Sequence, residues 1–246
     1  MEDDVIDRLR EKFWFVRKQN MGGALYLESK LVKKSMKVAV SILGADPPKT
    51  VEQHCRDVLD AGADWIHIDV MDGRCVPNTK YAGNEVLELR QKLPDAYFDC
   101  HMMVVDPANW VEKMAQAKVN MFTYHYEEVY NHETLIQKIR DHGMSVGVAL
   151  RSTTPIDALD DIIHLIDMVL VVTVEHTGIG GQALMPAMIE KVKRLRAKWP
   201  QITIEIDGGL NLETRELARS SGADVIVGGW VILKAEDIAG VIKQMR

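Results

Sequence analysis

The sequence predicts a (β/α)8 barrel, on the evidence of its length, its alternation of short strands with longer helices, and the number of strands. A chain of 246 residues is close to the typical length of one such barrel. From Lys37 onward, β-branched runs alternate with helical patterns, which indicates a parallel sheet. Eight strand candidates favour a closed barrel over the alternative, an open doubly wound sheet. We therefore assign residues 37–246 to a barrel domain and residues 1–36 to an N-terminal extension.

The predicted strands are the short runs rich in β-branched and apolar residues. In chain order they are Lys37–Leu43, Trp65–Asp69, Tyr97–Met102, Met121–His125, Ser145–Leu150, Met168–Val174, Ile202–Asp207 and Val225–Val227.

Helical patterns lie between these runs and after the last of them, at Val51–Leu59, Glu85–Lys92, Trp110–Ala115, Thr134–His142, Pro186–Lys198, Leu212–Ser220 and Ile238–Met245. The connection around Pro155–Ile163 has the weakest helical pattern. The glycines of Ala61–Asp64 and Ser221–Asp224 suit the C-caps of helices that precede a strand.

The N-terminal extension differs from the rest of the chain. Val5, Leu9, Phe13 and Val16 place one apolar stripe on a helix. We interpret it as a helix packed across the bottom of the barrel, or as a tail, rather than as a membrane-binding helix. Met36 directly precedes the first strand and is an alternative start.

The composition is that of an ordinary soluble protein, with 47% hydrophobic residues, 27% charged residues and a net charge of −6. It lacks the basic surplus that nucleic-acid binding needs, and no apolar run approaches the roughly 18 residues of a membrane span. Three cysteines without metal-ligand spacing favour a reducing compartment. The acidic Glu2-Asp3-Asp4 argues against a secretory or mitochondrial leader. We expect a cytoplasmic protein with a small-molecule partner and neither nucleic acid nor membrane.

Polar residues gather at the ends of three predicted strands. His67 and Asp69 alternate with apolar residues and share one strand face, while His101 and Asp207 end two other strands. Because the carboxyl ends of barrel strands surround one mouth, these side chains should converge there. A lone histidine at a strand end is usually just hydrogen-bonded, but four such groups are costly to bury unpaired. Two imidazoles and two carboxylates suit Zn²⁺, Fe²⁺, Mn²⁺ or Co²⁺.

Three motifs carry a family resemblance: His-Ile-Asp-Val-Met-Asp-Gly from His67, Cys-His-Met-Met-Val from Cys100, and Glu-Ile-Asp-Gly-Gly from Glu205. They resemble the hallmark motifs of the ribulose-phosphate 3-epimerase family. The resemblance runs in order from about Val38 to the C-terminus, with further matches at Ser41-Ile42-Leu43, Val76-Pro77-Asn78, His125 with Glu127, and Gly180-Gly181-Gln182.

The resemblance implies an isomerase of the pentose phosphate pathway that interconverts D-ribulose 5-phosphate and D-xylulose 5-phosphate and forms homo-oligomers. It implies one divalent metal ion held by His67, Asp69, His101 and Asp207, with the two aspartates as acid–base groups. Epimerisation next to a ketone removes a proton from one face and returns a proton to the other. One acid–base group on each face, with a cation to stabilise the developing enediolate, meets that requirement.

The resemblance also implies residues that bind the substrate. Ser41 would contact the substrate or an aspartate, although a hydrogen-bonded serine of the barrel interior is an equal reading. Met71 and Met103 would crowd the reacting centre and exclude water. Backbone amides of glycine-rich loops hold phosphate, and the candidates are Gly178, Gly180, Gly181, Gly208, Gly209, Gly228 and Gly229.

Two departures from the family pattern lie at the predicted phosphate end. The loop Thr173–Gln182 lacks the Pro-Gly-Phe of the usual Pro-Gly-Phe-Gly-Gly-Gln and has one extra residue, and Trp230 replaces a small hydroxyl residue. The indole either packs aside or narrows the pocket. Two alternatives therefore stay open: an epimerase for another ketose phosphate, and a non-catalytic paralogue that binds sugar phosphates.

Overall fold

Eight parallel strands close into a barrel in the computed structural model, which describes residues 36–246. Around the barrel they are β1 (Lys37–Ser41), β2 (Trp65–Asp72), β4 (Phe98–Met103), β5 (Met121–His125), β6 (Ser145–Leu150), β7 (Met168–Val172), β8 (Thr203–Asp207) and β9 (Val225–Gly228). The barrel closes because β1 pairs in parallel with both β2 and β9. The predicted fold is confirmed, and the open sheet is excluded.

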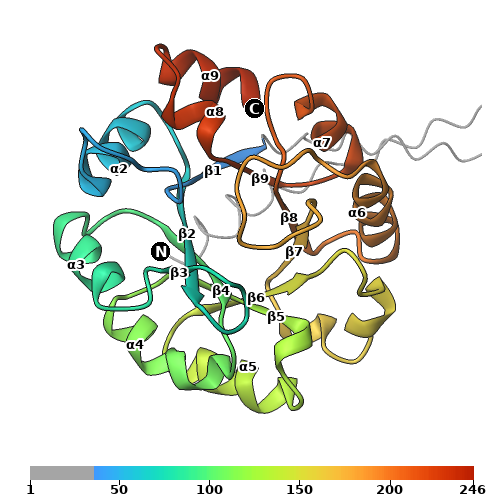
Figure 1. Ribbon diagram of the computed structural model, residues 1–246. Coiled ribbons are helices and arrows are strands. Elements are labelled where there is room, and N and C mark those ends of the chain that lie inside the picture. The colour runs from blue at the N-terminus through green and yellow to red at the C-terminus, as the bar shows by residue number, and fades with distance from the viewer. Residues whose placement is uncertain (1–35) are drawn as a thin grey trace, which may run out of the picture. The chain divides into compact units, whose positions relative to one another are not determined.

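Helices form a ring outside the strands (Figure 1). They are α2 (Val51–Asp60), α3 (Glu85–Lys92), α4 (Val111–Gln116), α5 (His132–Asp141), α6 (Pro186–Lys198), α7 (Arg215–Ser221), α8 (Trp230–Leu233) and α9 (Ile238–Met245). Local sequence signals set their ends. Thr50 and Gln53 form a reciprocal capping box at the start of α2, and Gly222 ends α7 in a left-handed conformation. None of the described helices is long and apolar enough to cross a membrane.

The structure differs from the sequence prediction in short segments. The connection around Pro155–Ile163, where the helical pattern was weakest, contains two 3₁₀ helices, η3 (Ile156–Leu159) and η4 (Ile163–Leu165). The two-residue strand β3 (Thr79–Lys80) and α8 were not predicted, because segments this short carry no periodic pattern. Two further 3₁₀ helices, η1 (Pro107–Trp110) and η2 (Tyr126–Glu128), follow β4 and β5. The predicted helix of the N-terminal extension lies outside the described residues.

The barrel interior is layered by residue type. Apolar side chains from the strand starts, among them Trp65, Met121, Met168 and Val225, fill the end of the barrel where the strands begin. Polar side chains occupy the next positions, two residues further along β2, β4 and β8. Side chains on one face of a strand recur every second residue, so this layering carries the polar groups to the carboxyl ends of the strands.

One buried cation joins α3 to two neighbouring connections. The Arg90 guanidinium donates hydrogen bonds to the carbonyl oxygens of Ala96 at 2.7 Å, Leu93 at 3.0 Å and Ala117 at 3.1 Å, and it stacks 3.8 Å from the Phe98 ring centroid. Removing it leaves buried carbonyl groups without a donor.

We expect Arg90→Met to lower the free energy of unfolding by about 3 kcal/mol, because several buried acceptors lose their partner at once. Urea denaturation followed by circular dichroism measures this change. The control is Arg56→Met, since the Arg56 side chain is 52% exposed and its ion pair with Glu52 is solvated. Equal, small effects of both substitutions would show that the Arg90 contacts contribute little.

Candidate active site

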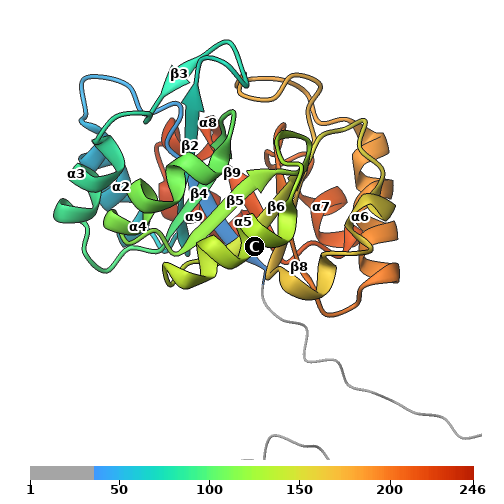
Figure 2. The same cartoon turned by 90° about the horizontal axis from the view of Figure 1, so that it is seen from below.

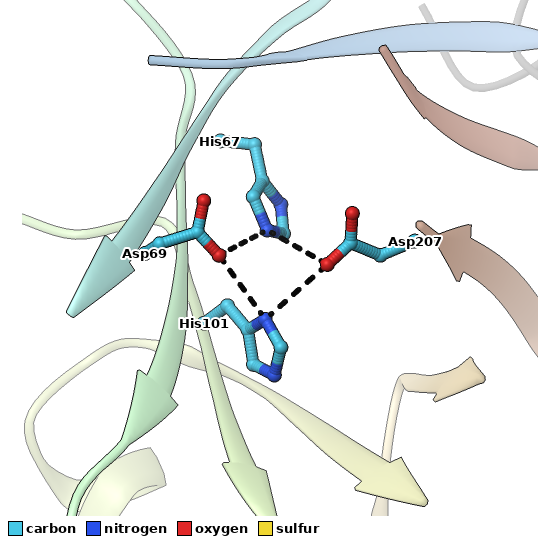
Figure 3. Close-up of side chains that lie close together, drawn as sticks. All are labelled: His67, Asp69, His101 and Asp207. Carbon is cyan, nitrogen blue, oxygen red and sulfur yellow. Dashed lines mark ion pairs between the residues drawn. The ribbon is translucent and has the colours of Figure 1, made fainter. Parts of the chain in front are cut away.

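The four sequence-predicted ligands meet at the mouth of the barrel (Figure 3). Asp69 Oδ1 lies 3.5 Å from His67 Nε2 and 3.4 Å from His101 Nδ1, and Asp207 Oδ2 lies 3.9 Å and 3.6 Å from the same two nitrogens. Figure 3 shows the aspartates on opposite sides of the imidazoles. This arrangement follows from the strands, since β2 and β8 are separated around the barrel by β1 and β9.

The geometry fits a divalent cation. Within residues 36–246, His67 Nε2 and His101 Nδ1 are buried and have no hydrogen-bond partner. Ligand atoms about 2.1 Å from a tetrahedral ion lie about 3.4 Å from one another. The observed separations of 3.4 to 3.9 Å are close to that value. Two imidazole nitrogens and two carboxylates are also a donor set that transition metals accept.

The other nitrogen of each imidazole has a partner of its own. His67 Nδ1 lies 2.6 Å from Asp99 Oδ2, a fully buried carboxylate. His101 Nε2 lies 2.9 Å from His125 Nε2, and the two rings stack with centroids 4.9 Å apart. Such contacts hold a ligand ring in one orientation.

The charges in this cluster perturb one another. Burial alone would raise the pKa of Asp69, but His67 and His101 outweigh it and hold that pKa below its usual range. Burial alone would lower the pKa of His67, yet Asp99 and Asp69 raise it well above its usual value. The pKa of His101 is likewise raised, against burial, by Asp207 and Asp69. The site is therefore built for positive charge enclosed by carboxylates.

The smaller predicted residues at the reacting centre are in place. Ser41 Oγ donates a 2.7 Å hydrogen bond to Asp69 Oδ2, which orients that carboxylate. Met71 and Met103 are buried and pack with Val76 in one apolar cluster. They lie above the ligands on β2 and β4, in the register that pairs Met71 with Met103.

A cavity of about 490 Å³ adjoins Asp69 and Asp207. Its wall is mostly backbone and includes six of the seven predicted glycines: Gly178, Gly180, Gly181, Gly208, Gly209 and Gly229. Gly228 does not line it, and a Cβ there would lie 2.5 Å from Ile232 Cδ1. At Gly209, which has a φ of +68°, a Cβ would lie 2.2 Å from Leu184 N, so only glycine fits.

The altered loop between β7 and α6 is ordered by its own side chains. Gln182 Nε2 donates to the carbonyl oxygens of His176 and Ile179, at 2.6 Å and 2.7 Å. Asn78 Nδ2 donates a 2.9 Å hydrogen bond to the Gly178 carbonyl oxygen and so joins this loop to the segment before β3. Figure 2 shows β3 and this loop at the same end of the barrel.

Trp230 lies at the edge of the cavity and is 54% exposed. Its indole lies against Gly44, where a Cβ would be 2.7 Å from Nε1, and beside Gly180, where a Cβ would be 3.5 Å from the same atom. The indole therefore both packs against glycine backbone and forms part of the wall of the predicted phosphate pocket.

Four further residues belong to the site, and sequence reasoning gave them no role. Asp99 and Glu205 are fully buried on the inner face, two residues before His101 and Asp207. Burial, and then the charge of Asp99, raise the pKa of Glu205 well above its usual value, which favours its protonated form. The alternation of polar and apolar residues was the signal for both. His125 and Glu127 formed part of the family resemblance only.

His125 and Glu127 continue the contacts of His101 toward the surface. Burial lowers the pKa of His125 to about 4, so the ring is neutral. Burial alone would raise the pKa of Glu127, but hydrogen bonds, first that of His125 and then that of Thr154, lower it to about 2.

Comparison with known proteins agrees with this geometry. The sequence profile described as "Ribulose-phosphate 3 epimerase family" matches residues 37–233, which include all four ligand candidates. The chain belongs to the ribulose-phosphate 3-epimerase family. The family is one of isomerases, as the sequence resemblance predicted. The ribulose-phosphate 3-epimerase of Eremothecium gossypii is 42% identical over 219 residues, which cover 85% of this chain and 91% of that protein. The cytoplasmic isoform of ribulose-phosphate 3-epimerase from Oryza sativa is also 42% identical, over 85% of this chain and 92% of the relative.

Solved structures of more distant proteins share the fold of this ribulose-phosphate 3-epimerase family member. KGPDC from Streptococcus mutans has a TM-score of 0.65 at 15% identity, covering 85% of this chain and 95% of that protein. The same protein was also solved in complex with a sugar phosphate, with a TM-score of 0.63 at 15% identity, covering 86% and 96%. A 3-hexulose-6-phosphate synthase has a TM-score of 0.62 at 17% identity, covering 85% and 98%. At these identities the likeness concerns the fold alone.

Proposed function

We propose that the chain is a metal-dependent epimerase that interconverts D-ribulose 5-phosphate and D-xylulose 5-phosphate in the pentose phosphate pathway. One observation carries the proposal: two carboxylates face each other across a pair of buried imidazole nitrogens that have no hydrogen-bond partner within residues 36–246. Family membership and the adjoining cavity support it.

The two aspartates would perform the proton transfers at C3 of the ketose. One carboxylate removes the C3 proton from one face, which leaves an enediolate, and the other carboxylic acid returns a proton to the opposite face. One aspartate must therefore be protonated in each direction. Ser41 supports the exchange because its hydroxyl holds Asp69 in a fixed orientation.

His67, Asp69, His101 and Asp207 would hold one divalent cation, Zn²⁺, Fe²⁺, Mn²⁺ or Co²⁺. Such an ion supplies Lewis-acid stabilisation of negative charge on the oxygens of the substrate. Met71 and Met103 limit water at the reacting carbon, since both are buried beside the ligands.

The glycine-lined wall would bind the phosphate group. It combines backbone from the loops after β7, β8 and β9, and this is the corner where barrels usually bind phosphate. Backbone N–H groups do not depend on side-chain identity, so the altered sequence of the β7–α6 loop is compatible with phosphate binding.

The experiment that tests the proposal measures bound metal in the purified protein and the turnover of D-ribulose 5-phosphate in a coupled assay. A six-carbon ketose phosphate serves as the competing substrate, because the altered loop and Trp230 border the phosphate pocket. We expect stoichiometric metal and faster turnover of the five-carbon substrate. Metal without turnover of any ketose phosphate would favour a binding paralogue instead.

Trp230→Ser should lower the KM for D-ribulose 5-phosphate about five-fold, because a serine hydroxyl adds a hydrogen bond worth about 1 kcal/mol and removes the indole from the wall. Initial rates at varied substrate concentration give the KM. Trp110→Ser is the control, since Trp110 starts α4 away from the cavity. An unchanged KM in the Trp230 variant would mean that the indole only packs.

The proposal extends to the location and assembly of the protein. A relative with 42% identity is named a cytoplasmic isoform, which supports a cytoplasmic location. The family resemblance supports a homo-oligomer, and light scattering of the purified protein measures its molar mass directly.

A further inference from the structure

His101 is connected to the barrel surface by a row of three side chains. His101 Nε2 lies 2.9 Å from His125 Nε2, and His125 Nδ1 lies 3.4 Å from Glu127 Oε2. Both imidazoles are buried, and the Glu127 side chain is 19% exposed. Within residues 36–246, no other hydrogen-bond partner reaches His125 Nδ1 or Glu127 Oε2.

The direction of these contacts is fixed at the carboxylate. An ionised carboxylate only accepts hydrogen bonds, so His125 must present its proton at Nδ1 toward Glu127. A neutral imidazole has one proton, and His125 Nε2 is then an acceptor. His101 consequently carries its proton on Nε2 and presents the lone pair of Nδ1 to Asp69 and Asp207.

We propose that His125 and Glu127 are positioning residues that select the tautomer of His101 in which Nδ1 faces the cation site. The inference rests on the metal dependence proposed above. The second imidazole ligand is handled differently, since His67 contacts the carboxylate of Asp99 directly at 2.6 Å. On β4 the carboxylate acts through an intervening imidazole.

One isosteric substitution reverses the row. The other oxygen of Glu127, Oε1, accepts a 3.0 Å hydrogen bond from the backbone N–H of Arg151 and a further one from the Thr154 hydroxyl. In Glu127→Gln, the backbone donor retains the amide oxygen at that position, so the NH₂ group faces His125 Nδ1. His125 then carries its proton on Nε2, and His101 must place its own proton on Nδ1, where the cation would bind.

The test measures Zn²⁺ affinity at pH 8 by competition with a chromophoric chelator. We expect Glu127→Gln to weaken Zn²⁺ binding about 10- to 100-fold. The matched control is Glu128→Gln, because Glu128 is also 19% exposed, is adjacent in sequence and pairs with Arg151 at 2.6 Å. The control should stay within about two-fold of the wild type.

A second pair of variants separates positioning from packing. A glutamine at position 125 places an amide oxygen where the ring Nε2 lies, so His125→Gln should retain most of the Zn²⁺ affinity. His125→Leu should lose about as much as Glu127→Gln. In the Zn²⁺-loaded wild type, long-range ¹H–¹⁵N spectra should show His125 protonated at Nδ1, with the signal identified by its loss in His125→Gln.

Wild-type affinity in Glu127→Gln, an equal loss in Glu128→Gln, or a His125 proton on Nε2 would overturn the inference. The spectrum needs no variant that must fold in order to be informative about the wild type. A wild-type protein that does not bind Zn²⁺ at all would instead contradict the proposed function, so the two failures are distinguishable.

Discussion

Asp207→Asn should abolish epimerisation while leaving exchange of the C3 proton measurable in one epimer. Asp207 and Asp69 lie on opposite sides of the two imidazoles, so each serves one face of the ketose. An amide cannot accept or deliver the proton, and we expect kcat to fall about 10³-fold. Asp69 remains able to remove and return a proton on its own face.

The measurement is ¹H NMR of each epimer in D₂O with Asp207→Asn and, separately, with Asp69→Asn. One variant should exchange the C3 proton of one epimer only, and the other variant that of the second epimer. Because both aspartates are also ligand candidates, the metal content of each variant is measured and excess Zn²⁺ is supplied. Substantial epimerisation by either variant would remove that residue from its proton-transfer role.

Removal of the metal should have a comparable effect. We expect dialysis against a strong chelator to lower turnover about 10³-fold, because charge that develops on the substrate oxygens loses its stabilising cation. One equivalent of Zn²⁺, Fe²⁺, Mn²⁺ or Co²⁺ should restore it. Activity that survives complete loss of metal would contradict metal dependence.

The fold itself should survive chelation. The candidate ligands lie at the mouth of the barrel, whereas the main apolar core lies between the strands and the surrounding helices. Far-ultraviolet circular dichroism should therefore change little. A chelated sample that unfolds would show that loss of turnover reports loss of structure.

The barrel could be predicted because its strands and helices have different periods in the sequence. The ligand set could be predicted for the same reason: His67 and Asp69 are two residues apart, and equivalent strand ends meet in a parallel barrel. The segment around Pro155–Ile163 could not, because two 3₁₀ turns leave no periodic pattern.

The contact between His101 and His125 was beyond sequence reasoning because it depends on the stagger between strands. His101 is opposite Thr123, so His125 reaches it diagonally. A shift of the register by one residue would turn His125 out of the barrel. The place of Trp230 depends likewise on the backbone around Gly44, which is distant in sequence.

Closure of the barrel by β1 and β9 has a consequence for biosynthesis. Lys37 pairs with Val225, so the first described strand waits unpaired on one side until almost all of the described chain has left the ribosome. A nascent or truncated chain that ends before Val225 would present bare backbone on β1 and β8, the kind of edge that invites aggregation. Premature stop codons near the 3′ end of the gene should therefore yield insoluble protein rather than a weakened enzyme.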